Sequence, residues 1–428
     1  MTFGLIKICA SLLLLIGVLY GIQKLGKTLS VHAEVQRKII HTGLGLYSLT
    51  FPLIFTQVWE VLVLCSATII LLTLIRTVTA IKDKLGSGLH SVERLSLGEI
   101  FFACSIGLLF YLKGDTVVLY ILPLLILTLS DAAAALVGTG YAKSFYTVES
   151  GKKSWEGSSF FFLTAWLLSM IALLLFSNIP RESVVTAALI IALFGALIEA
   201  VSWKGLDNLF VPVGLFLLLQ KLAFLPPGEL AIISIVFLSV LVLSVGIAKK
   251  MQLDVHAVNT VVTAAFFFWI VGGWANLAAP LAVFAAYLYL QRKENLSDDL
   301  PVVLSIISTA LFWYVISMVF AYNTYYVYNL SFGLHLIMLV LLQQNMRKVI
   351  PFIYVIFLSW MVTNVRVLFA SDFTVYDWQL SAGAFGMIFL AACLIMLSHR
   401  FFENRRWTKQ ALAVLALSSM GVPLTLWL

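Results

Sequence analysis

The chain has 428 residues, of which 62% are hydrophobic and only 11% are charged, and its mean hydropathy is +1.04. This composition excludes a water-soluble globular protein, and continuous apolar runs of roughly 17–25 residues exclude the short alternating strands of a membrane β-barrel. The net charge of +7 does not indicate nucleic-acid binding, because Lys and Arg lie in short loops between the apolar runs. We therefore predict an all-α, polytopic integral membrane protein.

Hydropathy predicts about 16 transmembrane helices. In the first part of the chain they cover residues 4–23, 39–56, 58–80, 98–112, 117–141, 159–177, 184–203 and 209–225. In the second part they cover residues 229–248, 256–273, 276–291, 300–320, 325–343, 350–370, 379–398 and 410–428. Basic residues concentrate in every second loop, so the positive-inside rule predicts that these loops face the cytoplasm and that both termini lie on the opposite side.

The first motif in chain order is GIQKLGKT at residues 21–28, which fits the phosphate-loop pattern G-x-x-x-x-G-K-[ST]. That pattern binds phosphate only where a strand enters the loop and a helix leaves it. Here an apolar helix precedes the motif. We therefore interpret residues 21–28 as a basic, flexible turn beside the membrane.

The sequence RKIIH places Arg37, Lys38 and His41 at the expected cytoplasmic start of the second span. Arg and Lys side chains at this level can bind phosphate groups. A histidine in this position is by itself more often structural than catalytic. The three residues become site candidates only together with the motifs that follow.

Asp131 lies inside the apolar run LTLSDAAAALVG. An aspartate at the centre of a span costs roughly 2.5–3.5 kcal/mol on insertion scales, so it usually faces a cavity or a partner. Asp131, Ala135 and Gly138 share one helical face, and the small residues allow a neighbouring helix to approach closely. The alternative is an acid that is hydrogen-bonded into the bundle for packing alone.

The loop that follows, AKSFYTVESGKKSWEGSS, combines basic residues with Gly and Ser. Lysines and exposed backbone N–H groups can hold phosphates. Ordinary positive-inside charge would explain the lysines alone, but the interleaved Gly, Ser and Glu favour an ordered binding loop. The candidates for phosphate binding here are Lys143, Lys152, Lys153, Ser154, Glu156, Gly157 and Ser158.

A third polar group occurs in GALIEAVSWKGLDNLFVP, where Glu199 ends one span and Asp207 and Asn208 begin the next. Carboxylate and amide oxygens suit Mg²⁺ that arrives with a nucleotide. Asp207 could instead only cap a helix. Together with Asp131, these residues are the predicted metal ligands, and the topology brings all the motifs to one membrane face. Acids for a metal, cations for phosphates and a histidine or aspartate as base are typical of a phosphoryl-transfer site. The catalytic candidates are Asp131, His41 and Glu199.

The order of these motifs resembles the CTP-dependent polyprenol kinases, a family that includes dolichol kinase and phytol kinase. The resemblance covers about residues 30–225. The matching residues are Arg37, Lys38, His41, Asp131, Ala134, Gly138, Lys153, Ser154, Glu156, Gly157, Ser158, Glu199, Asp207, Asn208 and Pro212. One departure is Ala142, which stands before Lys143 where such proteins often have a second glycine.

The resemblance implies an integral membrane kinase that uses CTP and a divalent cation such as Mg²⁺ to phosphorylate an isoprenoid alcohol taken from the bilayer. Its active site would lie on the cytoplasmic side. The resemblance extends to membrane cytidylyltransferases, so formation of a CDP-activated lipid is an alternative. A transporter with Asp131 and Glu199 as coupling carboxylates is a second alternative.

The sequence LPPGEL at residues 225–230 predicts a boundary between a catalytic membrane domain, residues 1–225, and a second membrane domain, residues 226–428. The second domain repeats none of the acidic or lysine motifs of the first. Its most polar features are Arg366 within an apolar span and the basic segment 399–409. They predict no function for the second domain.

Overall fold

The computed structural model describes residues 2–28, 33–77, 97–148, 151–202, 205–251, 254–294, 299–320, 323–341, 352–365, 375–397 and 407–427. Apart from one short hairpin, the regular structure in these ranges is helical. Nine of the described helices are long and apolar enough to cross a membrane, and three shorter ones are also apolar. The prediction of an all-α membrane protein is confirmed, whereas the number of about 16 spans is not. Arg366 and most of the segment 399–409 lie outside the described residues.

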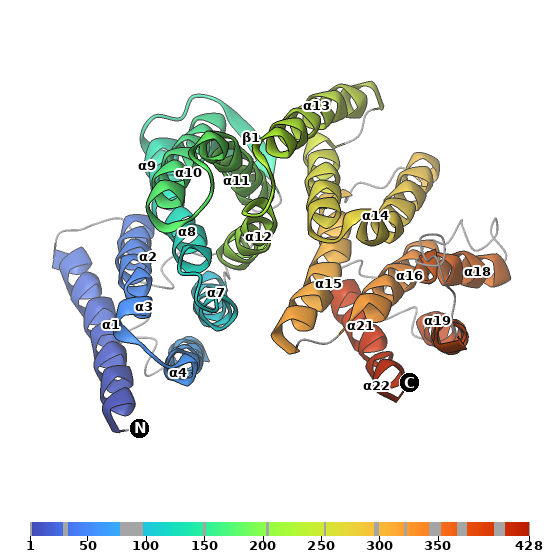
Figure 1. The fold of residues 1–428 in the computed structure, drawn as a ribbon, viewed down its shortest axis with the longest axis horizontal. Helices are drawn as coiled ribbons and strands as arrows, with labels where there is room; N and C mark the ends of the chain where they lie inside the picture. The colour runs from blue at the N-terminus through green and yellow to red at the C-terminus, as the bar shows by residue number, and fades with distance from the viewer. Residues whose placement is uncertain are drawn as a thin grey trace. The chain divides into compact units, whose positions relative to one another are not determined.

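The chain folds into two compact units, Met1–Ser239 and Val240–Leu428. The elements of the first unit are α1 Thr2–Thr28, α2 Ala33–Leu49, α3 Phe51–Ile54, α4 Val58–Thr77, α7 Gly98–Leu112, α8 Val118–Leu125, η2 Ile126–Ser130, α9 Asp131–Gly140, β1 Phe145–Val148, β2 Gly151–Ser154, α10 Trp155–Phe176, α11 Arg181–Val201 and α12 Asp207–Leu222 (Figure 1). Helix α13, Pro227–Met251, contains the division between the two units.

The second unit is built around α16, Tyr325–Leu341, in which every residue from Val327 onward is buried. The helices of this unit are α14 Val255–Glu294, α15 Asp299–Phe320, α16, α18 Phe352–Thr363, α19 Val375–Leu397, α21 Trp407–Ser419 and α22 Val422–Trp427. The backbone of α14 departs from helical geometry at Gly273, where φ is 67°. This break separates the two spans that the sequence predicts within α14. Glycine is suited to the position, because it adopts such a φ without steric cost.

Helix α1 continues through Thr28, so the sequence GIQKLGKT is the last part of a long helix. The prediction of a flexible turn there is therefore wrong. The conclusion that this segment is no phosphate loop agrees with the structure, since no strand precedes it in the described part of the chain.

The segment between α9 and α10 contains an antiparallel hairpin that was not predicted from the sequence. Strand β1 pairs with β2 so that Tyr146 lies opposite Lys153 and Thr147 lies opposite Lys152. The two aromatic and two β-branched residues of FYTV are a sequence signal for a strand, but the glycines and lysines around it favour a loop. The hairpin fixes the direction in which successive lysines point, because neighbouring side chains alternate between the two faces of a strand.

Two glycines allow α9 and the start of α10 to lie in close contact. A Cβ atom at Gly157 would lie 2.9 Å from the Ala134 carbonyl oxygen, and one at Gly138 would lie 3.0 Å from the Ser154 hydroxyl. The glycines in these motifs therefore serve close packing of backbone on backbone. This contact holds the hairpin against the helix that carries Asp131.

Candidate phosphoryl-transfer site

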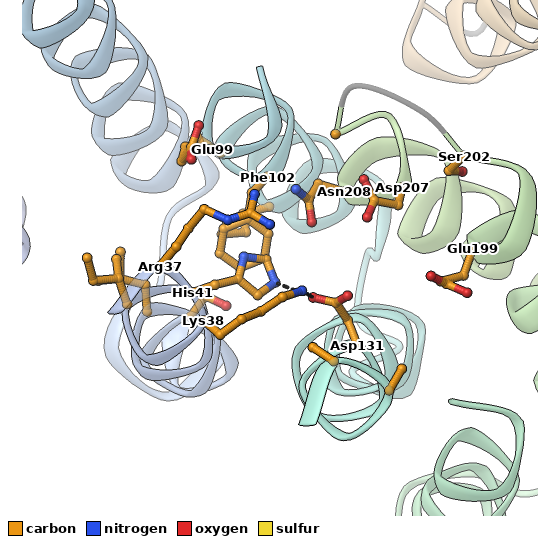
Figure 2. Close-up of a pocket in the computed structure, with 18 of the residues that line it drawn as sticks. Arg37, Lys38, His41, Glu99, Phe102, Asp131, Glu199, Ser202, Asp207 and Asn208 are labelled. Carbon is orange, nitrogen blue, oxygen red and sulfur yellow. Dashed lines mark hydrogen bonds and ion pairs between the residues drawn. The ribbon is translucent and has the colours of Figure 1, made fainter. Parts of the chain in front are cut away.

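The first unit contains a cavity of about 920 Å³ whose walls include residues of α1, α2, α3, α4, α7, α9, β1, β2, α10, α11 and α12. All of the predicted site residues except Lys143 and Glu156 line this cavity. The candidates that meet there are Arg37, Lys38, His41, Asp131, Lys152, Lys153, Ser154, Gly157, Ser158, Glu199, Asp207 and Asn208. Figure 2 shows α2 supplying Arg37, Lys38 and His41 on one side, while Asp131, Glu199, Asp207 and Asn208 approach from the other.

Asp131 is paired with a lysine from a different helix. Its carboxylate lies 2.6 Å from the Lys38 ammonium, and Asp131 is only 8% exposed. The His41 Nε2 atom is 4.0 Å from the same carboxylate oxygen, and its ring packs on Phe102 with centroids 4.6 Å apart. Lys38 and His41 lie one turn apart on α2, which is why both side chains reach Asp131.

A π-helical segment, η2, directly precedes Asp131 within an otherwise α-helical span. Such segments interrupt the regular hydrogen-bond ladder and occur frequently at functional sites. The segment begins three residues after Pro123, which has no backbone N–H to donate. The π-helical segment therefore changes the direction of the Asp131 side chain relative to the one that a regular α-helix would give.

A second lysine–carboxylate pair joins β2 to α11. The Lys153 ammonium lies 2.7 Å from a Glu199 carboxylate oxygen and also donates to the Glu199 backbone carbonyl. Burial lowers the pKa of Lys153, but the carboxylates of Glu199 and Asp207 together raise it above the ordinary value of 10.5. Lys153 is therefore a cation at neutral pH. With the Glu199 carboxylate ionised, the stability that the Lys153 charge contributes is fully present below pH 10.5 and is lost as the pH rises through the raised pKa.

Other residues of the predicted phosphate loop hold the hairpin in place. Ser154 caps α10 by accepting a hydrogen bond from the Gly157 N–H at 3.1 Å. Glu156 accepts hydrogen bonds from the backbone N–H groups of Lys143 and Ser144, each at 3.1 Å. The hydroxyls of Tyr146 and Ser158 share a hydrogen bond of 2.6 Å. The structure thus gives Glu156 a contact that fixes the turn before the hairpin, and it leaves the Lys143 side chain exposed outside the cavity lining.

Oxygen atoms from α11 and α12 could hold a divalent cation together with substrate phosphates. One carboxylate oxygen of Glu199, Oε2, is buried without a hydrogen-bond partner among the described residues, and Asp207 and Asn208 face the same cavity. The described residues contain no cluster of three or more His, Cys, Asp or Glu side chains that could hold a metal by themselves. One or two carboxylates completed by phosphate oxygens and water is the usual environment of Mg²⁺, so this donor set fits Mg²⁺ bound with a nucleotide.

Several polar residues of the cavity were not predicted from the sequence, among them two charged ones. Arg76 in the last turn of α4, Glu99 in the first turn of α7 and Ser202 after α11 all line it. Arg76 and Glu99 appear in the sequence as ordinary charges at the ends of apolar spans. Only the packing of α4 and α7 beside α2 and α12 shows that they border the same space.

Away from these charges, most of the cavity lining is apolar. Leucine and isoleucine side chains from four helices contribute to it: Leu15 and Leu19 of α1, Leu44 of α2, Leu64 and Leu72 of α4, and Ile106 of α7. The cavity therefore joins a charged region to a hydrocarbon-lined region within one unit. Such a combination suits an amphiphile that has one polar end.

A curated phytol kinase of Synechocystis sp. is 32% identical to this chain over 187 residues, which represent 42% of this chain and 76% of that relative. No protein-family model matches the chain. No solved structure matches it. The identity and the extent of the match to the phytol kinase show that the chain belongs to the polyprenol and phytol kinase-like family.

Proposed function

We propose that this protein is a membrane kinase that transfers the γ-phosphate of a nucleoside triphosphate to the hydroxyl of a long-chain isoprenoid alcohol. The observation that carries this proposal is the cavity itself, in which two lysine–carboxylate pairs lie at one end and hydrocarbon side chains line the other. A soluble alcohol would not need the apolar half, and a transporter would not need a hairpin that presents two lysines to the cavity. The similarity to a phytol kinase supports the same assignment.

In this proposal the alcohol enters from the bilayer and its hydroxyl reaches Asp131, where the charged and apolar regions meet. The hydroxyl oxygen bonds to the γ-phosphorus, the bond between that phosphorus and the β–γ bridging oxygen breaks, and the nucleoside diphosphate leaves. Asp131 accepts the proton of the alcohol, assisted by the neighbouring His41. Lys38, which pairs with Asp131 at 2.6 Å, neutralises charge on the transferred phosphoryl group in this proposal.

The lysines of the hairpin and the oxygens of α11 and α12 form the proposed nucleotide side of the site. Lys152 and Lys153 neutralise phosphate charge, and Arg37 supplies a further cation from α2. Glu199, Asp207 and Asn208 would hold Mg²⁺, which neutralises charge on the β- and γ-phosphates. Phosphoryl transfer depends mainly on positioning and charge neutralisation, so a site built from such pairs needs no covalent intermediate.

The family resemblance implies CTP as the donor and the cytoplasmic face as the location of the site, and both belong to this proposal. The basic loops that flank the site, interpreted by the positive-inside rule, favour that face. Lys152 and Lys153 would then meet cytoplasmic nucleotide directly.

The proposal is tested with the purified full chain in nanodiscs, supplied in turn with γ-labelled CTP, ATP, GTP and UTP, Mg²⁺ and a panel of prenols. We expect label in a prenyl monophosphate, release of the nucleoside diphosphate and loss of transfer in EDTA. Release of pyrophosphate would instead identify a cytidylyltransferase. The variant Asp131→Asn keeps the shape of the side chain and should lower kcat by about 10²–10³-fold. A folded Asp131→Asn protein with full activity would disprove the site assignment.

A further inference from the structure

The mostly apolar part of the cavity is lined by residues of α1, α2, α4 and α7, and we refer to this part as the channel. On α4 the lining residues Leu64, Thr68, Leu72 and Arg76 recur at every fourth position, so one face of the helix follows the channel. Arg76 lies at the charged end, and Leu64 lies roughly 18 Å further along the helix at the usual rise per residue. The channel therefore has a charged end and a distal end.

Helix α2 defines the same direction. Lys38 and His41 contact the Asp131 region, and Tyr47 lies roughly 13 Å further along the helix than Lys38. On α1 the lining residues are Leu19, Leu15 and Ser11, which follow one another at four-residue intervals. Ser11 and Tyr47 are hydrogen-bonded to each other, so the two helices run in opposite directions and their lining residues meet at the distal end.

A hydrogen-bonded aromatic side chain, that of Tyr47, lines the distal end. The hydroxyls of Tyr47 and Ser11 are 2.6 Å apart, and the Ser11 hydroxyl donates to the Lys7 carbonyl at 2.8 Å, so Tyr47 is the donor to Ser11. The Tyr47 ring packs edge to face on Phe51, with centroids 5.3 Å apart. The Phe51 ring in turn packs on Phe55 at 5.1 Å.

The residues around this contact are buried. Ser11, Phe51 and Phe55 are 4%, 5% and 2% exposed, and Ser11 and Phe51 line the cavity together with Tyr47. The Lys7 ammonium donates to the Ile54 carbonyl at 2.7 Å, which ties α1 to the end of α3. A chain that extends beyond Tyr47 would have to break a partly buried hydrogen bond and displace packed aromatic rings.

We propose that Tyr47, held by Ser11 and supported by Phe51, is the floor of the hydrocarbon subsite and sets the longest isoprenoid chain that the protein accepts. The identity of the ligand as an isoprenoid alcohol rests on the function proposed above, whereas the floor rests on the contacts alone. A lipid tail gains little hydrophobic free energy on moving from the bilayer into an apolar channel, because both are equally apolar. Chain-length preference is therefore decided by packing and by the distance from the hydroxyl to the floor.

The test measures binding without nucleotide, using tritiated farnesol, geranylgeraniol, geranylfarnesol and a long polyprenol with the full chain in nanodiscs. We expect the wild type to bind prenols up to a limiting chain length and to bind longer prenols more weakly. Tyr47→Ala should move the limit to a longer prenol and increase the affinity for the first prenol beyond the original limit by about tenfold. Tyr47→Phe, which keeps the ring, should leave the limit in place. Leu46→Ala is the matched control, because Leu46 is the preceding residue on α2, is 46% exposed and does not line the cavity.

A second variant covers the case in which Tyr47→Ala does not fold. Leu64→Phe adds volume at the distal part of α4 and should move the limit to a shorter prenol, while the adjacent and 44% exposed Val63 provides the control Val63→Phe. An unchanged limit in folded Tyr47→Ala or Leu64→Phe, or an equal shift in the controls, would overturn the floor. Chain-length-dependent binding without any phosphoryl transfer would refute the proposed function and leave the floor standing. A wild type that binds no prenol would overturn both.

Discussion

At the scale of single residues, the site consists of charges that neutralise one another across helices. Asp131 pairs with Lys38, and Glu199 pairs with Lys153. Each pair is mostly buried, with side-chain exposures of 22% for the lysine and 12% for the carboxylate. An acid in an apolar span is stable when such a partner is present, and a nucleotide phosphate can compete for the same lysine.

The Lys38–Asp131 pair gives a prediction about stability that is separate from activity. Lys38→Met leaves a buried carboxylate without its partner and should lower the free energy of unfolding by about 3 kcal/mol. Adding Asp131→Asn should recover most of that loss, because the double variant has no unpaired charge, while the enzyme stays inactive. Thermal unfolding of the two single variants and the double variant in the same detergent measures the coupling. Additive losses would mean that the two side chains do not interact.

At the scale of elements, the site depends on one hairpin being held against α9. The hairpin presents Lys152 and Lys153 to the cavity, and the Glu156 carboxylate holds the turn before it through the N–H groups of Lys143 and Ser144. The close approach of Gly157 to Ala134 and Gly138 sets the distance between this assembly and Asp131.

The fractional loss of kcat/KM in Gly157→Ala should therefore be larger than the fractional loss of its free energy of unfolding. The new methyl group would meet the Ala134 carbonyl and the Ser154 hydroxyl, both at 2.9 Å, so the start of α10 must move away from α9. We expect a drop in kcat/KM of about 10²-fold, since small displacements of positioning groups reduce phosphoryl transfer strongly. Gly140→Ala is the control, because a Cβ there meets no atom within 4 Å. Equal activities of the two variants would contradict the role of this contact.

At the scale of the whole molecule, every residue that lines the large cavity belongs to the first compact unit. The similarity to the phytol kinase covers 42% of this chain, so more than half of the chain lies outside it. The second unit has its own buried core around α16. The cavity thus does not require the second unit for its walls.

We therefore predict that a chain ending at residue 251, the last residue of α13, keeps prenol kinase activity within about tenfold of the full chain. The measurement compares phosphoryl transfer by the two forms in nanodiscs, after size-exclusion chromatography has verified that the short form is monodisperse. A monodisperse short form without activity would show that the second unit contributes to catalysis or to substrate entry.

The sequence by itself determined the class of the protein and predicted many of the polar residues that line the cavity. Hydropathy alone predicts membrane helices, because a backbone in the bilayer must satisfy its own hydrogen bonds. The ordered motifs from Arg37 to Asn208 predicted residues that do line one cavity, because polar groups in apolar spans are costly unless they have a partner or a cavity. Their individual chemical roles stay predictions.

Only the tertiary structure decided which charges pair, which residues build the hairpin and where the cavity ends. The partnership of Lys38 with Asp131 joins residues 93 positions apart, and that of Ser11 with Tyr47 joins residues 36 apart. Local patterns carry no information about such distances, because many leucine-rich helices can pack in many orders with similar energy. For the same reason Arg76, Glu99 and Tyr47 look ordinary in the sequence, and their place at the two ends of one channel follows only from the way α1, α2, α4 and α7 pack.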